Sequence, residues 1–287
     1  MNKLLIICGP TATGKTKLAL QLAKKFDGEL INADSQQVYK GLDALTGKDR
    51  SDEVPIWLYD VVSPEEEFSV AHFVRLADEA ISDVVKRKKL PIVIGGTGFY
   101  LRALTQNVDT IFIPPNQNLR KRLAGTSVDQ LQKELERVDP DKWKIMNDSD
   151  QKNPRRLIRA IEVTAASAAA QRKPESFNVL WIGLMASLPF LKNRIAERVT
   201  ERFENAATEV RPGLPPILGA DPLLSHAHGL IAKEEAIEQW TNAEYAYARR
   251  QMTWFRKEKV IEWFDIEDPN YRQQIEQHVY QWYTDVS

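Results

Sequence analysis

The chain has 287 residues, 43% hydrophobic and 28% charged, which is typical of a soluble globular protein with one large domain or two smaller ones. The formal net charge of −1 excludes a basic field over the whole molecule, so a nucleic-acid site would require local clustering of cations. No apolar run is typical of a signal peptide or long enough to span a membrane, and the single cysteine, Cys8, excludes an internal disulfide. We therefore expect a cytoplasmic protein.

The N-terminal segment predicts a strand, a glycine-rich loop and a helix. Residues 4–8 are a short apolar run typical of a buried strand, and residues 15–26 carry apolar side chains at helical spacing. The residues between them match the P-loop pattern G-x-x-x-x-G-K-[ST], whose backbone N–H groups and helix N-terminus favour a bound phosphate. The predicted phosphate-binding residues are Gly9, Pro10, Thr11, Ala12, Thr13, Gly14, Lys15 and Thr16.

Two side chains of this loop carry its chemistry. Lys15 is expected to place a positive charge on a phosphate, and the Thr16 hydroxyl is expected to bind Mg²⁺ as the cofactor. The alternative is a glycine-rich turn that binds nothing, and the strand and helix on either side argue against it. The pattern itself does not say which polyphosphate or diphosphate is bound.

The following segments alternate between strand and helix. Residues 29–33 predict a strand that ends at Asp34, residues 69–87 a helix, and residues 90–94 a strand that ends at Gly95. This alternation predicts an α/β fold of the P-loop NTPase type, a parallel sheet with flanking helices. Because ligands collect beyond the carboxyl ends of parallel strands, all three strand ends are expected to converge on one cleft.

Asp34 and Thr97 are the polar side chains expected in that cleft. Asp34 would act as a general base, and a magnesium ligand or a helix cap is the simpler interpretation of the same residue. Thr97 follows the glycine pair 95–96 and would point its hydroxyl toward the same centre.

The middle of the chain predicts a helical insertion at residues 116–175 in a core formed by residues 1–115 and 176–287. Ser127 is expected to cap a helix that ends before Pro140, and Asn153 a second helix with proline at its first position. The second helix belongs to a basic stretch, residues 151–173, that contains six lysines and arginines and a single acidic residue, Glu162. The cations are Lys152, Arg155, Arg156, Arg159, Arg172 and Lys173. The stretch is either a solvated helix face or a surface for a polyanion.

The C-terminal part returns to core-like sequence. We expect strands at residues 179–184 and 260–264, and helices at 187–207, 233–257 and 269–284. Residues 211–222 are rich in proline and glycine and predict a loop.

Five segments together resemble the tRNA dimethylallyltransferase family over nearly the whole chain. They are Gly-Pro-Thr-Ala-Thr-Gly-Lys-Thr (9–16), Asp-Ser-Gln-Gln-Val-Tyr-Lys-Gly-Leu-Asp (34–43), Gly-Gly-Thr-Gly-Phe-Tyr-Leu (95–101), Asn-Pro-Arg-Arg-Leu-Ile-Arg-Ala-Ile-Glu-Val (153–163) and Tyr-Ala-Arg-Arg-Gln-Met-Thr-Trp-Phe-Arg (247–256). The order and spacing of the segments make the resemblance specific.

The resemblance implies transfer of a dimethylallyl group from dimethylallyl diphosphate to the exocyclic amine of the adenosine 3′ of the anticodon in tRNA. It also implies that the protein is a monomer, requires Mg²⁺ and does not associate with a membrane. It implies catalytic roles for Lys15, Asp34 and Thr97, and a helical insertion that grips the anticodon stem-loop. The residues that it implies for tRNA binding are Asp34, Ser35, Gln36, Gln37, Thr97, Arg120, Arg155, Arg156, Arg159, Arg249 and Arg250.

The chain departs from the family pattern in its C-terminal half. Leu218-Gly-Ala-Asp-Pro222 replaces Ile-Gly-Tyr-Lys-Glu, Glu244-Tyr245 replaces a Thr-Arg pair, and the segment 202–210 is about five residues short. Loss of an arginine near a phosphate site removes a fixed positive charge. These departures make a tRNA-binding paralogue with impaired catalysis one alternative. Two further alternatives, which share the P-loop, are an isopentenyltransferase of free adenine nucleotides and a small-molecule kinase.

Overall fold

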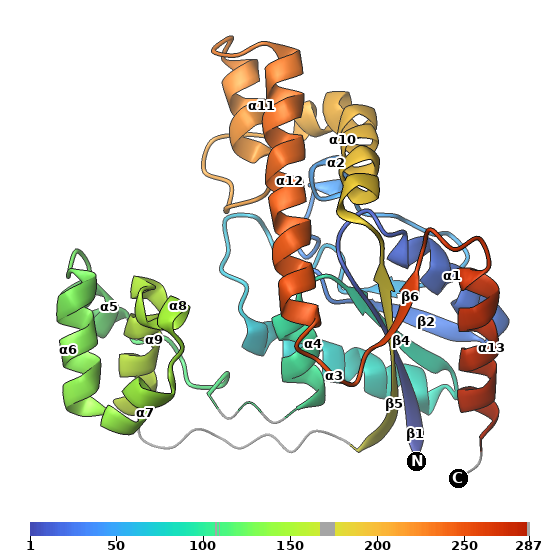
Figure 1. The fold of residues 1–287 in the computed structure, drawn as a ribbon, viewed down its shortest axis with the longest axis horizontal. Helices are drawn as coiled ribbons and strands as arrows, with labels where there is room; N and C mark the ends of the chain where they lie inside the picture. Colours follow the sequence, from blue (N-terminus) through green and yellow to red (C-terminus); the bar gives the residue numbers. More distant parts are fainter. Residues whose placement is uncertain (107, 109, 167–175, 286–287) are drawn as a thin grey trace. The chain divides into compact units, whose positions relative to one another are not determined.

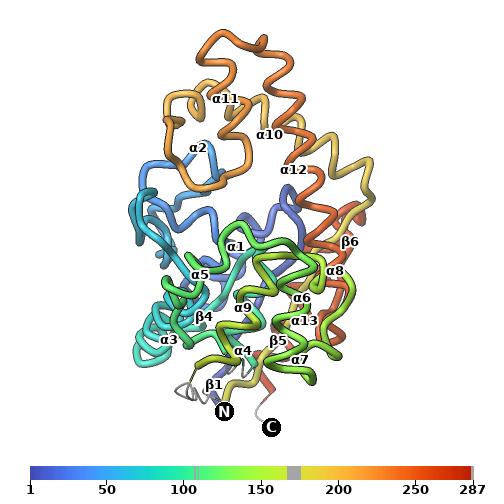
Figure 2. The backbone as a smooth tube through the Cα atoms, turned by 90° about the vertical axis from the view of Figure 1, so that its left-hand side faces the viewer, coloured from blue at the N-terminus to red at the C-terminus, as the bar shows by residue number. Residues whose placement is uncertain are grey.

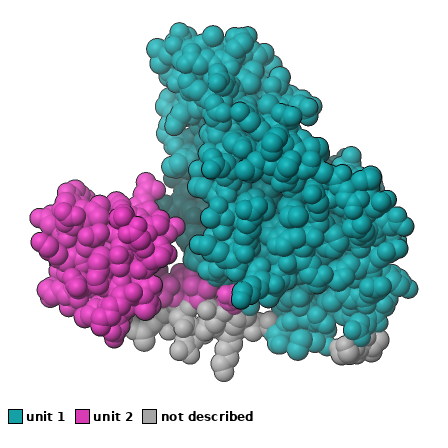
Figure 3. Space-filling view, in the orientation of Figure 1, with its two compact units in different colours: residues 1–105, 175–287 teal, residues 106–174 magenta. Residues whose placement is uncertain are grey.

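The computed structural model describes residues 1–106, 108, 110–166 and 176–285, and the chain divides into two compact units (Figure 3). Unit 1 contains residues 1–105 and 175–287, and unit 2 contains residues 106–174. The division at 105/106 differs from the expected boundary at 115/116. Its physical reason is Arg159 of unit 2, whose guanidinium donates to the carbonyls of Thr110 at 2.6 Å and Ile113 at 2.8 Å. Two residues of the predicted basic stretch, Arg172 and Lys173, lie outside the described residues.

In the described part of the chain, six parallel strands form one sheet with the order β3-β2-β4-β1-β5-β6 (Figure 1). They are β1 (Asn2–Cys8), β2 (Gly28–Asn32), β3 (Ile56–Trp57), β4 (Leu90–Gly95), β5 (Phe177–Met185) and β6 (Glu262–Asp265). The central strands are apolar runs because both faces of a parallel sheet are covered. The predicted α/β class is confirmed.

The helices of unit 1 fall into those that cover the sheet and those that extend beyond it (Figures 1 and 2). They are α1 (Lys15–Lys25), α2 (Asp43–Thr46), α3 (Val70–Lys86), α4 (Gly98–Thr105), α10 (Leu188–Glu209), α11 (Ala220–Ala227), α12 (Lys233–Phe255) and α13 (Tyr271–Thr284). On one face of the sheet, Leu5 and Ile7 of β1 belong to the same apolar cluster as Leu18 of α1 and Ile275 of α13. Cys8 at the end of β1 is fully buried, and burial raises the pKa of its thiol.

Helices α10, α11 and α12 and the short α2 share a separate apolar core beyond the strand ends. Its largest fully buried side chains are Trp240 of α12 and Phe203 of α10. The prediction of a loop over residues 211–222 is wrong for its last three residues, because Gly219 adopts a φ of +88° and α11 begins directly after it. No described helix of the chain combines the length and the apolar character needed to cross a membrane.

Unit 2 is a helical bundle with a core of its own, and its described residues contain no strand. Its helices are α5 (Gln117–Leu123), α6 (Val128–Val138), α7 (Pro140–Ile145), α8 (Asp148–Gln151) and α9 (Pro154–Thr164). Both predicted caps are confirmed. The Ser127 hydroxyl accepts from the Gln130 N–H in a capping box, and the Asn153 side chain accepts from the first N–H groups of α9.

Candidate functional site

The loop between β1 and α1 has the backbone of a phosphate cradle. Gly9 has a φ of +133°, and a Cβ there would overlap the carbonyl of Leu184 on the neighbouring strand. Gly14 has a φ of +82° directly before α1, so both glycines of the pattern are required by conformation. The Pro10 carbonyl accepts from Lys15 Nζ at 2.7 Å and from the Thr13 hydroxyl at 2.9 Å, which closes the loop on itself.

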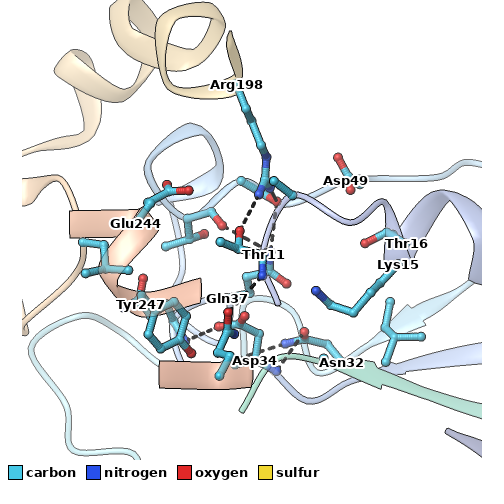
Figure 4. Close-up of a pocket in the computed structure, with 18 of the residues that line it drawn as sticks. Thr11, Lys15, Thr16, Asn32, Asp34, Gln37, Asp49, Arg198, Glu244 and Tyr247 are labelled. Carbon is cyan, nitrogen blue, oxygen red and sulfur yellow. Dashed lines mark hydrogen bonds between the residues drawn. The ribbon is translucent and has the colours of Figure 1, made fainter. Parts of the chain in front are cut away.

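Lys15 lies in the wall of a pocket at this end of the sheet (Figure 4). Burial disfavours its charged form and lowers its pKa to about 8, although the Asp34 carboxylate opposes the change. An anion bound beside Lys15 would stabilise its charged form, because the attraction between the two charges compensates for the hydration that the ammonium group loses on burial.

Asp34 follows two residues after the end of β2 and lines the same pocket. Its Oδ1 accepts from the Gln36 N–H at 2.9 Å, and its own N–H donates to Asn32 Oδ1 at 3.1 Å. Burial raises the pKa of this carboxyl group, and Lys15 acts in the opposite direction. A carboxylate with a raised pKa in a pocket is suited to accept a proton.

Thr97 connects the Asp34 loop to the turn after β4. Its hydroxyl oxygen accepts from the Ser35 N–H at 3.0 Å and donates to the Ser35 hydroxyl at 3.2 Å. The turn approaches the end of β2 so closely that a Cβ at Gly95 would overlap the backbone of Ala33. Thr97 therefore lies beside the Asp34 loop and fixes its backbone.

The neighbours of Asp34 have separate surroundings. The Gln36 and Gln37 side chains line the pocket, and Gln37 Nε2 donates to the carbonyls of Thr46 at 3.2 Å and Gly47 at 2.9 Å. Part of the remaining wall comes from α10 and α12, far along the chain. The lining residues outside the P-loop and residues 34–37 are Asn32, Leu45, Thr46, Gly47, Asp49, Ile94, Gly95, Arg194, Arg198, Leu218, Glu244, Tyr247 and Gln251.

Gln251 of α12 joins the P-loop to the turn after β4, and the sequence did not predict this role. Its Oε1 accepts from the Thr11 N–H at 2.9 Å, and its Nε2 donates to the Gly96 carbonyl at 2.9 Å. Gln251 is 5% exposed, so the bond to Gly96 is buried and the bond to Thr11 is partly shielded from water.

We expect Gln251→Ala to lower the free energy of unfolding by about 2 kcal/mol, because it leaves a shielded donor and acceptor unpaired. Urea unfolding followed by circular dichroism measures the change. Gln239→Ala, at an exposed position of the same helix, is the matched control and should change the value by less than about 0.5 kcal/mol. Equal effects of the two substitutions would contradict the bridging role.

Two arginines of α10 also reach the P-loop without having been predicted. Arg194 Nε donates to the Ala12 carbonyl at 2.8 Å, and Arg198 donates to the Thr11 hydroxyl at 3.1 Å. Their four-residue spacing places them on one side of the helix, but the same spacing is typical of an exposed helix face and gave no specific signal in the sequence.

Within unit 2, the predicted cations differ in their surroundings. Arg120 and Arg159 both pair with Glu162, whose side chain is fully buried, at 2.6 and 3.3 Å. Arg156 pairs with Asp150, whereas Arg155 is exposed at the start of α9. In unit 1, Arg249 and Arg250 are exposed on α12, and Arg250 lies over the Tyr247 ring with 5.7 Å to its centroid.

A P-loop at the carboxyl end of a parallel sheet, with a lysine and a carboxylate in one pocket above it, defines a protein of the P-loop class. Comparison with known proteins defines the class further. A family model described as IPP transferase matches residues 37–258, and one described as isopentenyl transferase matches residues 2–59. The chain belongs to the IPP transferase family.

Relatives and solved structures agree with this membership. A tRNA dimethylallyltransferase of Anoxybacillus flavithermus is 37% identical, over 93% of this chain and 91% of the relative. The crystal structure of a tRNA isopentenylpyrophosphate transferase from Bacillus halodurans has a TM-score of 0.71 at 31% identity and covers 98% of this chain and 97% of that one. A eukaryotic dimethylallyltransferase acting on tRNA has a TM-score of 0.78 at 26% identity, over 100% of this chain and 77% of its own.

Proposed function

We propose that this chain transfers the dimethylallyl group of dimethylallyl diphosphate to the exocyclic amine of the adenosine 3′ of the anticodon in tRNA. The observation that carries the proposal is a pocket that contains both a P-loop lysine, Lys15, and a half-buried carboxylate, Asp34. The Lys15 ammonium group can stabilise a departing diphosphate, and the Asp34 carboxylate can accept the proton that the amine loses. The names of the relatives, tRNA dimethylallyltransferases, support the same reaction.

In the proposed reaction the bond between the allylic carbon and the diphosphate oxygen breaks, and a bond from that carbon to the adenine nitrogen forms. Lys15 and the N–H groups of the P-loop stabilise the negative charge that develops on the leaving diphosphate. Asp34 accepts the proton that the amine releases. Thr97 holds the Asp34 loop through Ser35, so its contribution is to position the base.

The pocket has donors that fit a magnesium ion. Thr16 and Asp49 both line it, and a hydroxyl and a carboxylate oxygen are suitable ligands for an ion that takes its other ligands from a diphosphate and water. When bound, Mg²⁺ would neutralise charge on the diphosphate oxygens. We assign Thr16 and Asp49 to hold it.

Recognition of tRNA is assigned to the basic residues of both units. Arg155 of α9 and the exposed Arg249 and Arg250 of α12 offer guanidinium groups to phosphates. Ser35, Gln36 and Gln37 would surround the target adenosine beside Asp34. The adenosine has to leave its stack to reach the pocket, and a single-stranded loop lowers that cost.

We expect Arg155→Ala to weaken tRNA binding and to reduce the salt dependence of log Kd by about one unit of slope, because one phosphate contact is lost. Filter binding between 50 and 200 mM salt measures the slope. The thermal midpoint should stay unchanged, since this side chain is exposed. Arg159→Ala provides the contrast, because it withdraws a partner from buried Glu162 and should lower the midpoint. An unchanged salt slope in Arg155→Ala would make this helix face an ordinary solvated one.

The function is tested by incubating the protein with labelled dimethylallyl diphosphate and either unmodified tRNA or AMP, followed by mass spectrometry of the nucleosides. Prenylated adenosine in tRNA is the expected product. Label in AMP alone would identify an isopentenyltransferase of free nucleotides. Binding of tRNA without label would identify a paralogue that has lost catalysis.

A further inference from the structure

Three arginines follow one another at four-residue spacing along α10, and the first two of them line the pocket. Arg194 and Arg198 contact the P-loop, and Arg202 lies one turn further along the helix. No carboxylate among the described residues lies within 4 Å of the Arg194 or Arg198 guanidinium, whereas Arg202 pairs with Glu244 of α12 at 2.6 Å. The charges of the first two are therefore available to an anion in the pocket.

The short helix α2 ends between Arg198 and Arg202. Arg198 donates to the Gly47 carbonyl at 2.8 Å, and Arg202 donates to the Ala44 carbonyl at 3.2 Å. Gly47 has a φ of +64°, and a Cβ there would overlap both guanidinium groups. Two cations thus pack against the same glycine, and their mutual repulsion must be offset for both to stay in place.

Glu244 supplies that offset. Its side chain is 7% exposed, and Arg202 is 14% exposed, so the pair is shielded from solvent. Glu244 Oε1 accepts from Arg202, whereas Oε2 is buried without a hydrogen-bond partner among the described residues, and the residue lines the pocket. An acidic side chain would by itself repel a diphosphate, so its place in this wall requires a reason.

We infer that Glu244 is a positioning residue, which holds Arg202 against α2 and thereby keeps Arg198 in place as the second cationic wall of the diphosphate site. In this arrangement α10 supplies positive charge to the pocket in addition to that of Lys15. The pocket then needs no arginine at position 245, where this chain has tyrosine. The inference rests on the proposed function only in assigning diphosphate as the anion.

The direction in which Glu244→Gln changes the Kd for inorganic diphosphate distinguishes a positioning role of Glu244 from a purely electrostatic one. If Glu244 only adds negative charge, Glu244→Gln would bind inorganic diphosphate more tightly. If it positions Arg198, the substitution should raise the Kd for inorganic diphosphate about tenfold, because the positive charge of Arg202 beside Arg198 is no longer balanced. Isothermal titration calorimetry with the full chain and Mg²⁺ measures this Kd. In the transfer assay, KM for the prenyl donor should rise more than kcat falls.

Two further variants keep the test decisive. Arg202→Met combined with Glu244→Gln removes both charges and should bind diphosphate more tightly than either single variant, which a general loss of packing would not produce. Glu238→Gln, at an exposed position of α12, is the matched control with an unchanged Kd. Thermal unfolding checks that every variant folds.

Diphosphate affinity of folded Glu244→Gln equal to or above that of the unsubstituted protein would overturn the inference. Failure of the proposed function has a separate signature. In that case the unsubstituted protein would bind inorganic diphosphate but transfer no prenyl group to tRNA.

Discussion

Asp34→Asn is expected to lower kcat/KM for prenyl transfer by about 10²–10⁴-fold, the range typical of removing a general base, with the Kd for tRNA nearly unchanged. Asparagine keeps the shape of the side chain and can still accept from the Gln36 N–H, but it cannot take the proton of the amine. Transfer of labelled prenyl groups and filter binding of tRNA measure the two quantities. Asp52→Asn, at an exposed position, is the control that should retain full activity.

The pH dependence provides a second readout of the same residue. Burial raises the pKa of Asp34 above that of an ordinary aspartate, so the base is lost by protonation as the pH falls through this raised value. The rate of the unsubstituted protein should therefore decrease on the acid side, and the small residual rate of Asp34→Asn should lack that limb. Equal loss of transfer and of tRNA affinity in Asp34→Asn would instead assign Asp34 a structural role.

Lys15→Met is expected to reduce kcat/KM for prenyl transfer by about 10²–10³-fold, since it removes the P-loop cation proposed to stabilise the departing diphosphate. The protein should remain about as stable as before, because burial disfavours the charge of Lys15. Steady-state kinetics and thermal unfolding measure these effects. Lys17→Met, at an exposed position of the same helix, should be close to neutral.

The affinity for inorganic diphosphate should also depend on pH through the protonation of Lys15. Lys15 has a pKa of about 8, so it is charged below that pH and becomes neutral as the pH rises through it. Affinity for diphosphate should therefore fall above pH 8 in the unsubstituted protein relative to Lys15→Met, which has no such group. Parallel pH profiles of the two proteins would exclude a role for the Lys15 charge in anion binding.

The local parts of this structure follow from the sequence. The P-loop, the strand ends at Asp34 and Gly95 and the caps at Ser127 and Asn153 depend on residues that are neighbours in the chain. Such features can be predicted because a few adjacent residues determine backbone conformation and capping.

The part of the pocket wall that α10 and α12 form could not be predicted in the same way. Gln251 contacts Thr11, and Arg202 contacts Glu244, across long separations in sequence. Arginines at four-residue spacing are equally typical of an exposed helix face, so nothing local distinguishes Arg198 from a solvated side chain. The short α2 and β3 also escaped prediction, because elements of four and two residues carry no periodicity.

The burial of Cys8 has a practical consequence for experiments on this protein. Its thiol is fully buried in β1, and its raised pKa keeps it in the unreactive protonated form. A maleimide dye should therefore modify an introduced surface cysteine without prior removal of the native one. A cysteine at exposed position 145 of unit 2 and another at exposed position 230 of unit 1 would form a fluorescence energy-transfer pair, with which distance changes between the units on tRNA binding could be followed.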